Sequence, residues 1–189
     1  MKITLYFGSF NPIHNGHTSL AEYIVNNTDT DELWLVVSPN NPLKNRTELW
    51  DEQLRLRLAQ LAVEDKQKIK VTDFEFRLPR PSYTIDTLRA FSREYPHHEF
   101  TLLIGSDNMT IFHKWKDYKD ILLEYKIFVY PRRGDNISRL QTLYPEMSVL
   151  ADAPQFDISS TQIREKLKNG EDVSAYVNPK VADYINNNF

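Results

Sequence analysis

The chain contains no cysteine and has no excess of positive charge. Its 189 residues include 23 Lys and Arg against 26 Asp and Glu, which gives a formal net charge of −3. The lack of cysteine excludes disulfides, thiolate nucleophiles and cysteine-based zinc or iron–sulfur sites, and it suits a reducing compartment. Because no overall positive field attracts nucleic acid, any anionic partner must be bound by a local cluster of cations and helix ends.

Long hydrophobic runs are also missing. No stretch approaches the ~20 apolar residues that cross a bilayer, and the N-terminus has no basic segment followed by a long apolar one. We therefore expect a cytoplasmic protein with neither a membrane nor a nucleic-acid partner. With 41% hydrophobic and 12% aromatic residues, the chain is long enough for one substantial core and short for two. Residues 1–189 are expected to form a single domain.

Short apolar runs alternate with helical patterns along the chain. Apolar residues recur every three or four positions at 51–64 and 82–95, which predicts amphipathic helices. The alternation predicts an α/β fold, a doubly wound and mostly parallel sheet with helices on both faces. A helical portion at about 159–189 is expected to pack on it. The expected strands lie at 3–7, 33–37, 70–76, 100–104 and 126–130, with a weaker one at 148–150.

The most informative segment, GSFNPIHNGH at residues 8–17, follows the first apolar run. It places two glycines and two histidines at a strand-to-helix turn, where a helix start presents unpaired N–H groups to a ligand. We expect a phosphate there, with His14 and His17 donating ring N–H groups or, as imidazolium ions, stabilising charge at a five-coordinate phosphorus. Two alternatives stay open. In one, the histidines only satisfy polar groups within the turn; in the other, they bind a metal, although no third ligand is nearby in the sequence.

A second motif, SSTQIR at residues 159–164, reads as a helix start. Ser159 and Gln162 have the spacing of a capping box, and Gly170 is expected to end the helix. Arg164 lies near this start, where the helix dipole disfavours a cation and no carboxylate precedes it. Three hydroxyls, N–H groups and an arginine would together suit a polyphosphate. There is no Walker-type loop and no Gly-x-Gly-x-x-Gly fingerprint, so γ-phosphoryl transfer by the usual machinery is not expected.

Residues 8–17 and 158–164 resemble the two signatures of the nucleotidyltransferase superfamily, His-x-Gly-His and a late Ser-Ser-Thr-x-x-Arg. The resemblance implies a Rossmann-like fold that joins a nucleoside triphosphate to a phosphate-bearing acceptor and releases pyrophosphate. It implies catalytic roles for His14, His17 and Arg164. The residues expected to bind ATP are Gly8, Ser9, Phe10, Gly16, Gly105, Asp107, Arg132, Ile158, Ser159, Ser160 and Thr161.

The middle of the chain resembles the bacterial nicotinate-nucleotide adenylyltransferases. The likeness covers nearly the whole chain and rests on PSYTIDTL at 81–88 and IGSDN at 104–108, followed by Trp115. It implies a step of NAD biosynthesis in which ATP and nicotinate mononucleotide give deamido-NAD and pyrophosphate. Main-chain N–H groups at Thr84 would bind the pyridine carboxylate, Trp115 would stack on the ring, and Lys44 would meet a phosphate. Mg²⁺ is expected as cofactor, bound mainly through substrate phosphates, with no protein metal site.

Simpler interpretations of these residues stay open. Ser82 or Thr84 could cap a helix, Trp115 could be a half-buried surface anchor, and Asp107 could be an N-cap. The sequence also departs from the family at two places. Residues 41–44 read NPLK where Pro-Pro-His-Lys is common, and Asn11 stands where Asp is usual.

Three other functions share features with this chain. Pantetheine-phosphate adenylyltransferases carry both signatures, and a nicotinamide-preferring enzyme would differ only in the main-chain donors that meet the ring substituent. A silent nucleotide-binding sensor would keep the fold without turnover. A homo-oligomer is compatible with the sequence, which does not specify an oligomeric state.

Overall fold

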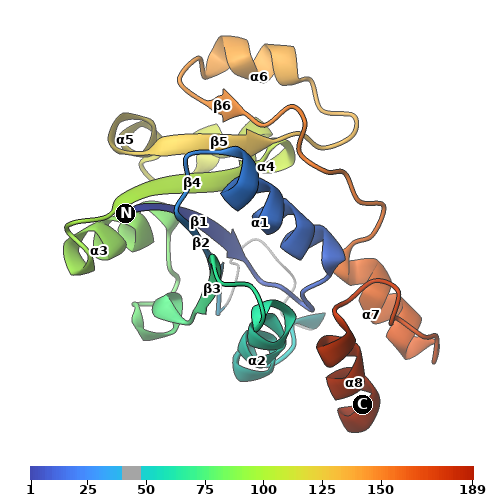
Figure 1. Ribbon diagram of the computed structural model, residues 1–189. Coiled ribbons are helices and arrows are strands. Elements are labelled where there is room, and N and C mark those ends of the chain that lie inside the picture. Colours follow the sequence, from blue (N-terminus) through green and yellow to red (C-terminus); the bar gives the residue numbers. More distant parts are fainter. Residues whose placement is uncertain (40–47) are drawn as a thin grey trace.

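The sheet is parallel, and its strand order places a switch point in the middle. The computed structural model describes residues 1–39 and 48–189 (Figure 1). Neighbouring strands pair in the order β3-β2-β1-β4-β5-β6, each pair parallel. The chain order reverses between β1 and β4, and ligands bind such sheets at the carboxyl ends of these strands. The strands are β1 (Lys2–Gly8), β2 (Glu32–Val37), β3 (Ile69–Thr72), β4 (Glu99–Gly105), β5 (Lys126–Tyr130) and β6 (Ser148–Val149).

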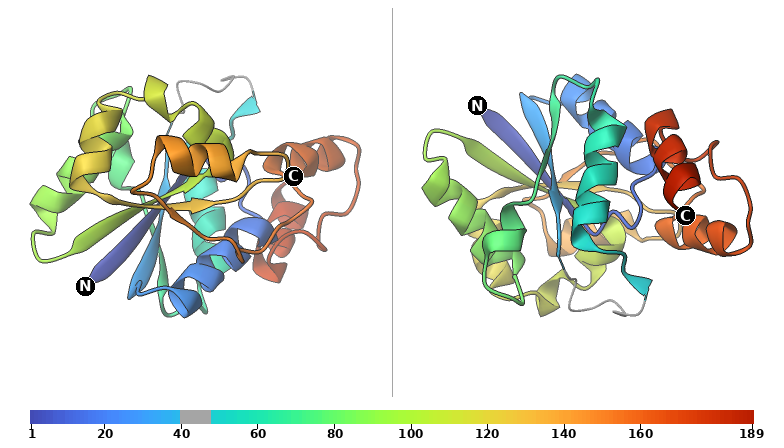
Figure 2. Two further views of the ribbon diagram at one scale, coloured as in Figure 1. Left: turned by 90° about the horizontal axis from the view of Figure 1, so that it is seen from above. Right: turned by 90° about the horizontal axis from the view of Figure 1, so that it is seen from below.

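Helices lie on both sides of this sheet (Figure 2). Side chains alternate along a strand, so Ile3 and Leu5 of β1 enter one buried core and Tyr6 enters the other. Helices α1, α2, α7 and α8 contribute to the core of Tyr6, and α3, α4, α5 and α6 to that of Ile3. The predicted doubly wound sheet is confirmed. The helices are α1 (Asn15–Asn27), α2 (Glu52–Val63), α3 (Thr84–Glu94), α4 (Ser106–Thr110), α5 (Tyr118–Glu124), α6 (Ile137–Leu143), α7 (Ser160–Lys168) and α8 (Pro179–Asn188).

One expected strand is shorter than predicted. The apolar run at 70–76 is a strand only to Thr72, and it continues as the 3₁₀ helix η2 (Phe74–Arg77). Phe74 and Glu75 are both buried in this 3₁₀ helix, where the ring of Phe74 stacks on Phe91 of α3 with centroids 3.8 Å apart and Glu75 accepts a hydrogen bond from Thr87 of α3. This packing on α3 overrides the local strand preference.

The last two helices pack beside α2 at one end of the sheet. Helix α8 contacts α2, and Pro179 stands at the first position of α8. Ile163 of α7 and Val181 of α8 are fully buried in the same core as α1 and α2. At the end of the chain, the ring of Phe189 stacks on Trp50 with centroids 4.8 Å apart.

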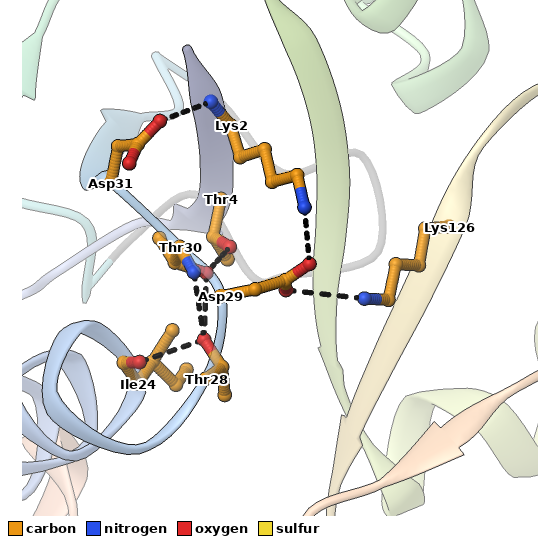
Figure 3. A network of polar contacts seen from close by, with 8 residues as sticks. All are labelled: Lys2, Thr4, Ile24, Thr28, Asp29, Thr30, Asp31 and Lys126. Atoms are coloured by element: carbon orange, nitrogen blue, oxygen red, sulfur yellow. Dashed lines mark hydrogen bonds and ion pairs between the residues drawn. The ribbon is translucent and has the colours of Figure 1, made fainter.

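Polar side chains hold the amino end of the sheet, opposite the switch point (Figure 3). Asp29 lies 2.8 Å from the ammonium group of Lys2 and 3.3 Å from that of Lys126, so it bridges β1 and β5. The buried hydroxyls of Thr4 and Thr30 lie 2.8 Å apart and hold the loop before β2. Within residues 1–39 and 48–189, no helix is long and apolar enough to span a membrane.

Candidate active site

The turn that leaves β1 is shaped by an aromatic ring. Phe10 is buried, and its φ of +43° lies in the left-handed region that side chains rarely adopt. Its ring fills the space beside Gly8, where an added Cβ would lie 2.8 Å from the ring. Glycine at position 8 is therefore required by packing within the protein, and the space that its missing side chain leaves is taken by Phe10.

His14 and His17 form a reciprocal cap at the start of α1. Nδ1 of His14 accepts a hydrogen bond from the main-chain N–H of Gly16 at 3.1 Å. Nδ1 of His17 accepts one from the main-chain N–H of His14, also at 3.1 Å. The two rings stack with centroids 3.7 Å apart. Because both Nδ1 atoms act as acceptors, this network assigns the proton of each neutral ring to Nε2.

His14 is a neutral imidazole at neutral pH. Burial and, to a smaller extent, the positive charge of Arg132 together lower the pKa of His14 to about 4. The expected imidazolium is therefore wrong for His14, whose ring can still donate a hydrogen bond from Nε2. The sequence could not show how deeply this ring is buried. Gly16 makes the burial feasible, because an added Cβ there would lie 2.8 Å from the His14 ring.

A pocket lies beside these histidines at the carboxyl ends of β1 and β5. Five predicted residues line it: His14, Gly16, His17, Arg132 and Ile158. The other lining residues are Tyr6, Leu20, Tyr130, Pro131, Arg133, Pro154, Gln155 and Phe156. The only available signal was the position of the two tyrosines in strands that a parallel sheet brings to one edge.

Arg132 brings a cation to this pocket. Its Nη2 donates to the hydroxyl of Tyr130 at 3.1 Å, and its Nε lies 3.8 Å from the carboxylate of Asp107. Its main-chain N–H donates to the buried hydroxyl of Ser106 at 2.7 Å, and that hydroxyl donates to Asp135. The backbone of Arg132 is thus fixed while half of its side chain stays exposed, an arrangement that suits an anion entering from solvent.

The start of α7 has the predicted capping box. The hydroxyl of Ser159 accepts a hydrogen bond from the main-chain N–H of Gln162 at 3.2 Å. The side-chain carbonyl of Gln162 accepts one from the main-chain N–H of Ser159 at 2.8 Å. Gly170, with φ +69°, follows the end of the helix as predicted. The hydroxyl of Ser160 donates to the main-chain carbonyl of Pro12 at 2.9 Å. This bond ties α7 to the turn after β1.

Arg164 makes a second link between the two motifs. Its Nη1 donates to the main-chain carbonyl of Asn11 at 2.8 Å, and its Nη2 donates to the carboxylate of Glu48 at 3.1 Å. The same Nη2 lies 3.4 Å from the hydroxyl of Thr161. Nε of Arg164 is buried with no hydrogen-bond partner in the described residues. No carboxylate precedes Arg164 at the helix start, and Glu48, 116 positions away, provides the one that pairs with it. Local sequence could not reveal this ion pair.

Asn11 uses both ends of its amide. Nδ2 donates to the main-chain carbonyl of Glu48 at 2.9 Å, and Oδ1 accepts from the main-chain N–H of Trp50 at 3.0 Å. An aspartate, the residue usual in the resembled family, could accept but could not donate. Asparagine therefore fits this particular arrangement of the main chain.

Arg55 of α2 is fully buried, and sequence reasoning missed it. Its Nη1 donates to the carbonyls of Ser9 and Ser38, at 2.6 and 2.8 Å. Its Nη2 donates to Pro39 at 3.0 Å and its Nε to Trp50 at 2.9 Å. The guanidinium joins the carboxyl ends of β1 and β2 to the start of α2. An arginine in an amphipathic helix pattern gives no signal of such burial.

Thr84 and Trp115 lie outside the pocket, on segments that face each other. Thr84 is the first residue of α3, and the N-cap Tyr83 makes no side-chain cap, so neither Ser82 nor Thr84 is the capping residue. Trp115 is half-buried beside Phe112, at the end of the 3₁₀ helix η3 (Phe112–Lys114). The next residue, Lys116, bonds to Asp86 of α3 at 2.7 Å and holds the two segments together.

Gly105 ends β4 and Asp107 lies in the helix that follows it, beside the switch point. Gly105 is the N-cap of α4, so the alternative that Asp107 caps this helix is wrong. A Cβ on Gly105 would lie 2.4 Å from the Asp107 carboxylate. Lys44 and the segment 41–44 lie outside the described residues. The structure thus brings the two histidines, Arg132 and Ile158 together in one pocket, with Arg164 bonded to the turn beside it.

Comparison with known proteins places this chain among named relatives. Residues 5–166 match the cytidylyltransferase-like family. The chain is 46% identical over 189 residues to a protein of Flavobacterium johnsoniae, covering 100% of this chain and 97% of that protein. It is 49% identical over 180 residues to a protein of Bacteroides fragilis, covering 95% and 89%. Both relatives are named as probable nicotinate-nucleotide adenylyltransferases.

Solved structures share the fold. The nicotinic acid mononucleotide adenylyltransferase of Plasmodium falciparum, in complex with NaAD, superposes with a TM-score of 0.82 at 22% identity. The match covers 98% of this chain and 95% of that one. At this identity the likeness concerns the fold, and it confirms the Rossmann-like prediction.

Proposed function

We propose that this chain transfers the adenylyl group of ATP to nicotinate mononucleotide. The reason is that the chain belongs to the cytidylyltransferase-like family and to the nicotinate-nucleotide adenylyltransferases. The products are deamido-NAD and pyrophosphate, in a step of NAD biosynthesis. One observation supports the location of the reaction above all. The bond from Arg164 to the carbonyl of Asn11 joins the two motifs at the switch point of the sheet.

The reaction needs no nucleophile from the protein. A 5′-phosphate oxygen of the mononucleotide attacks the α-phosphorus of ATP in line, and the bond from this phosphorus to the β-phosphate oxygen breaks. Its electron pair leaves with pyrophosphate. The acceptor phosphate is already largely ionised at neutral pH, so no general base is required. The protein has to hold two anions together and stabilise the charge that spreads over the phosphorus.

His14 and His17 are proposed to meet the α-phosphate. Each neutral ring carries its proton on Nε2, because Nδ1 is held by the main chain. These N–H groups are fixed in direction before substrate arrives, which favours the transition state over the ground state. In His14 the donor is a neutral imidazole, since its pKa is about 4.

The triphosphate is proposed to lie between the two motifs. Arg132 supplies a half-exposed cation at the pocket, and Ser159 to Thr161 with Arg164 lie at the start of α7. The buried Nε of Arg164 has no hydrogen-bond partner among residues 1–39 and 48–189, which supports an oxygen ligand nearby. Lys44 is proposed to contact the acceptor phosphate or the triphosphate.

The nicotinate ring is proposed to bind between the start of α3 and Trp115. The first N–H groups of α3 have no side-chain cap, and they can donate to the pyridine carboxylate near Thr84. The indole of Trp115 is half-buried, which leaves a face for stacking.

Mg²⁺ is the proposed cofactor, and the donor set of the pocket indicates how it would be held. The histidines offer nitrogen, whereas Mg²⁺ prefers oxygen ligands, so the ion would be bound mainly by ATP oxygens. When bound, Mg²⁺ neutralises phosphate charge and orients the leaving pyrophosphate. Arg132 and the histidines would then contact the phosphate oxygens that the ion does not.

A single-turnover reaction tests this proposal. Enzyme in excess over radiolabelled Mg-ATP is mixed with nicotinate mononucleotide, and the dinucleotide and pyrophosphate are measured together. The proposal predicts equal amounts of both products and no labelled protein. Binding of ATP without any product would instead identify a nucleotide-binding sensor, and pyrophosphate without dinucleotide would indicate hydrolysis.

A further inference from the structure

A buried carboxylate lies beneath the start of α3 and has no place in the mechanism above. Glu75 of η2 is only 4% exposed. Within residues 1–39 and 48–189, no cation forms an ion pair with it, and no charged neighbour contributes to its pKa shift. A carboxylate buried in this way is costly unless other groups donate hydrogen bonds to it.

Thr87 makes one such bond, and the hydroxyls of Ser38 and Ser82 lie near enough to help stabilise the charge. The hydroxyl of Thr87 donates to Glu75 Oε1 at 2.8 Å. Burial raises the pKa of Glu75, and hydrogen bonding from Thr87, Ser38 and Ser82 opposes that shift. A carboxylate accepts at both oxygens, so one side chain can hold all three hydroxyls.

Two of these hydroxyls, those of Ser82 and Thr87, flank the start of α3. Ser82 precedes the N-cap of α3, and Thr87 lies one turn inside the helix, where its N–H donates to the carbonyl of Tyr83 at 3.1 Å. Ser38 follows β2, against which η2 packs. Glu75 therefore fixes the start of α3 relative to the sheet. The first N–H groups of α3 have no side-chain cap.

We infer that Glu75 is a positioning residue for substrate choice, which holds the start of α3 so that its N–H groups match the ring carboxylate of the acceptor. The inference rests on the proposed function. Two N–H donors at fixed positions suit two carboxylate oxygens. An amide would turn its NH₂ group toward one donor, and that mismatch is penalised only while the donors cannot move.

The test compares Glu75→Gln with the wild-type enzyme on three substrates. Glutamine keeps the shape but places an NH₂ group among hydroxyl donors, which loosens the helix start. KM for nicotinate mononucleotide is expected to rise about tenfold, and the ratio of kcat/KM for nicotinate over nicotinamide mononucleotide to fall about tenfold, equivalent to about 1.4 kcal/mol. KM for ATP should stay within about twofold.

Two further variants keep the inference falsifiable. Thr87→Val removes one hydroxyl donor with little change of shape, and it should shift the same ratio in the same direction even if Glu75→Gln folds poorly. Glu146→Gln removes an exposed carboxylate far from this cluster and should change nothing. An unchanged or increased ratio in both cluster variants, or an equal rise in KM for ATP and the mononucleotide, would overturn the inference.

Direct binding separates this inference from the proposed function. Calorimetric titration of nicotinate and nicotinamide mononucleotide into wild type and Glu75→Gln needs no turnover. If the wild type forms no dinucleotide, the proposed reaction fails, and the binding ratio still tests Glu75. If the wild type turns over normally but Glu75→Gln keeps the wild-type binding ratio, only the assignment of Glu75 fails.

Discussion

The guanidinium of Arg164 donates a hydrogen bond to the main-chain carbonyl of Asn11, 2.8 Å away across 153 positions of sequence. A second bond, from the hydroxyl of Ser160 to the main-chain carbonyl of Pro12, joins the same two segments. The two motifs therefore form one rigid unit in which α7 supports the turn after β1. In this arrangement Arg164, which is proposed to act on the phosphates, also fixes the turn after β1.

Replacing Arg164 by Lys should keep the positive charge and lose the forked geometry. Loss of the bonds to Asn11 and Glu48 is expected to lower kcat/KM for ATP by about 10- to 100-fold, equivalent to about 1.4–2.8 kcal/mol. The matched control is Lys168→Gln, which removes an exposed cation of the same helix that also lies near Glu48, at 3.5 Å. A comparable loss in this control would mean that only the charge near Glu48 matters.

Arg55→Met should destabilise the fold by about 3 kcal/mol or more. Methionine fills similar volume but leaves several buried carbonyls without a donor, and each costs about 1–3 kcal/mol. Urea unfolding measures the difference. Arg57→Met changes an exposed arginine of the same helix and should alter the free energy of unfolding by less than about 0.5 kcal/mol. If the two variants unfold alike, the carbonyl bonds of Arg55 contribute nothing to stability.

His14 should make the protein sensitive to mild acid. Its pKa is lowered from 6.5 to about 4 in the folded state. As the pH falls below 6.5, His14 becomes protonated in the unfolded chain but stays neutral in the folded chain. The free energy of unfolding therefore decreases between pH 6.5 and 4. Between pH 7 and 5 the loss amounts to about 2 kcal/mol. His14→Asn keeps a capping side chain without this titration and should lose about 2 kcal/mol less over that interval. Parallel curves would show that His14 titrates normally.

His17→Ala should lower kcat much more than it raises KM for ATP. The contact of its Nε2–H with the α-phosphate is expected to strengthen in the transition state, so kcat should fall by about 100- to 1,000-fold. His113→Ala, at an exposed histidine, provides the control and should leave both constants unchanged. Near-normal turnover of His17→Ala would remove its catalytic assignment.

The parts of the fold and site that sequence could predict are those set by local pattern. Alternating apolar runs indicated the parallel sheet, and the spacing of Ser159 and Gln162 indicated a capping box. Local pattern failed where distant segments decide the outcome. Glu48 meets Arg164 across 116 positions, and Arg55 is buried only because four carbonyls from separate segments converge on it.

The pocket walls were missed for a related reason. Tyr6 and Tyr130 look like ordinary strand residues, and only the pairing of β1 and β5 with β4 brings them to the pocket. The strand predicted at 70–76 was wrong beyond Thr72, because Phe74 and Glu75 leave the strand to pack on α3. In both cases long-range packing, which local sequence does not encode, set the structure.

The most direct measurement is pyrophosphate release from Mg-ATP with nicotinate mononucleotide, nicotinamide mononucleotide and phosphopantetheine offered separately at equal concentration. The account predicts a preference for the nicotinate compound of about 100-fold or more, equivalent to about 2.7 kcal/mol of transition-state discrimination. Faster release with phosphopantetheine, or none with the nicotinate compound, would contradict it.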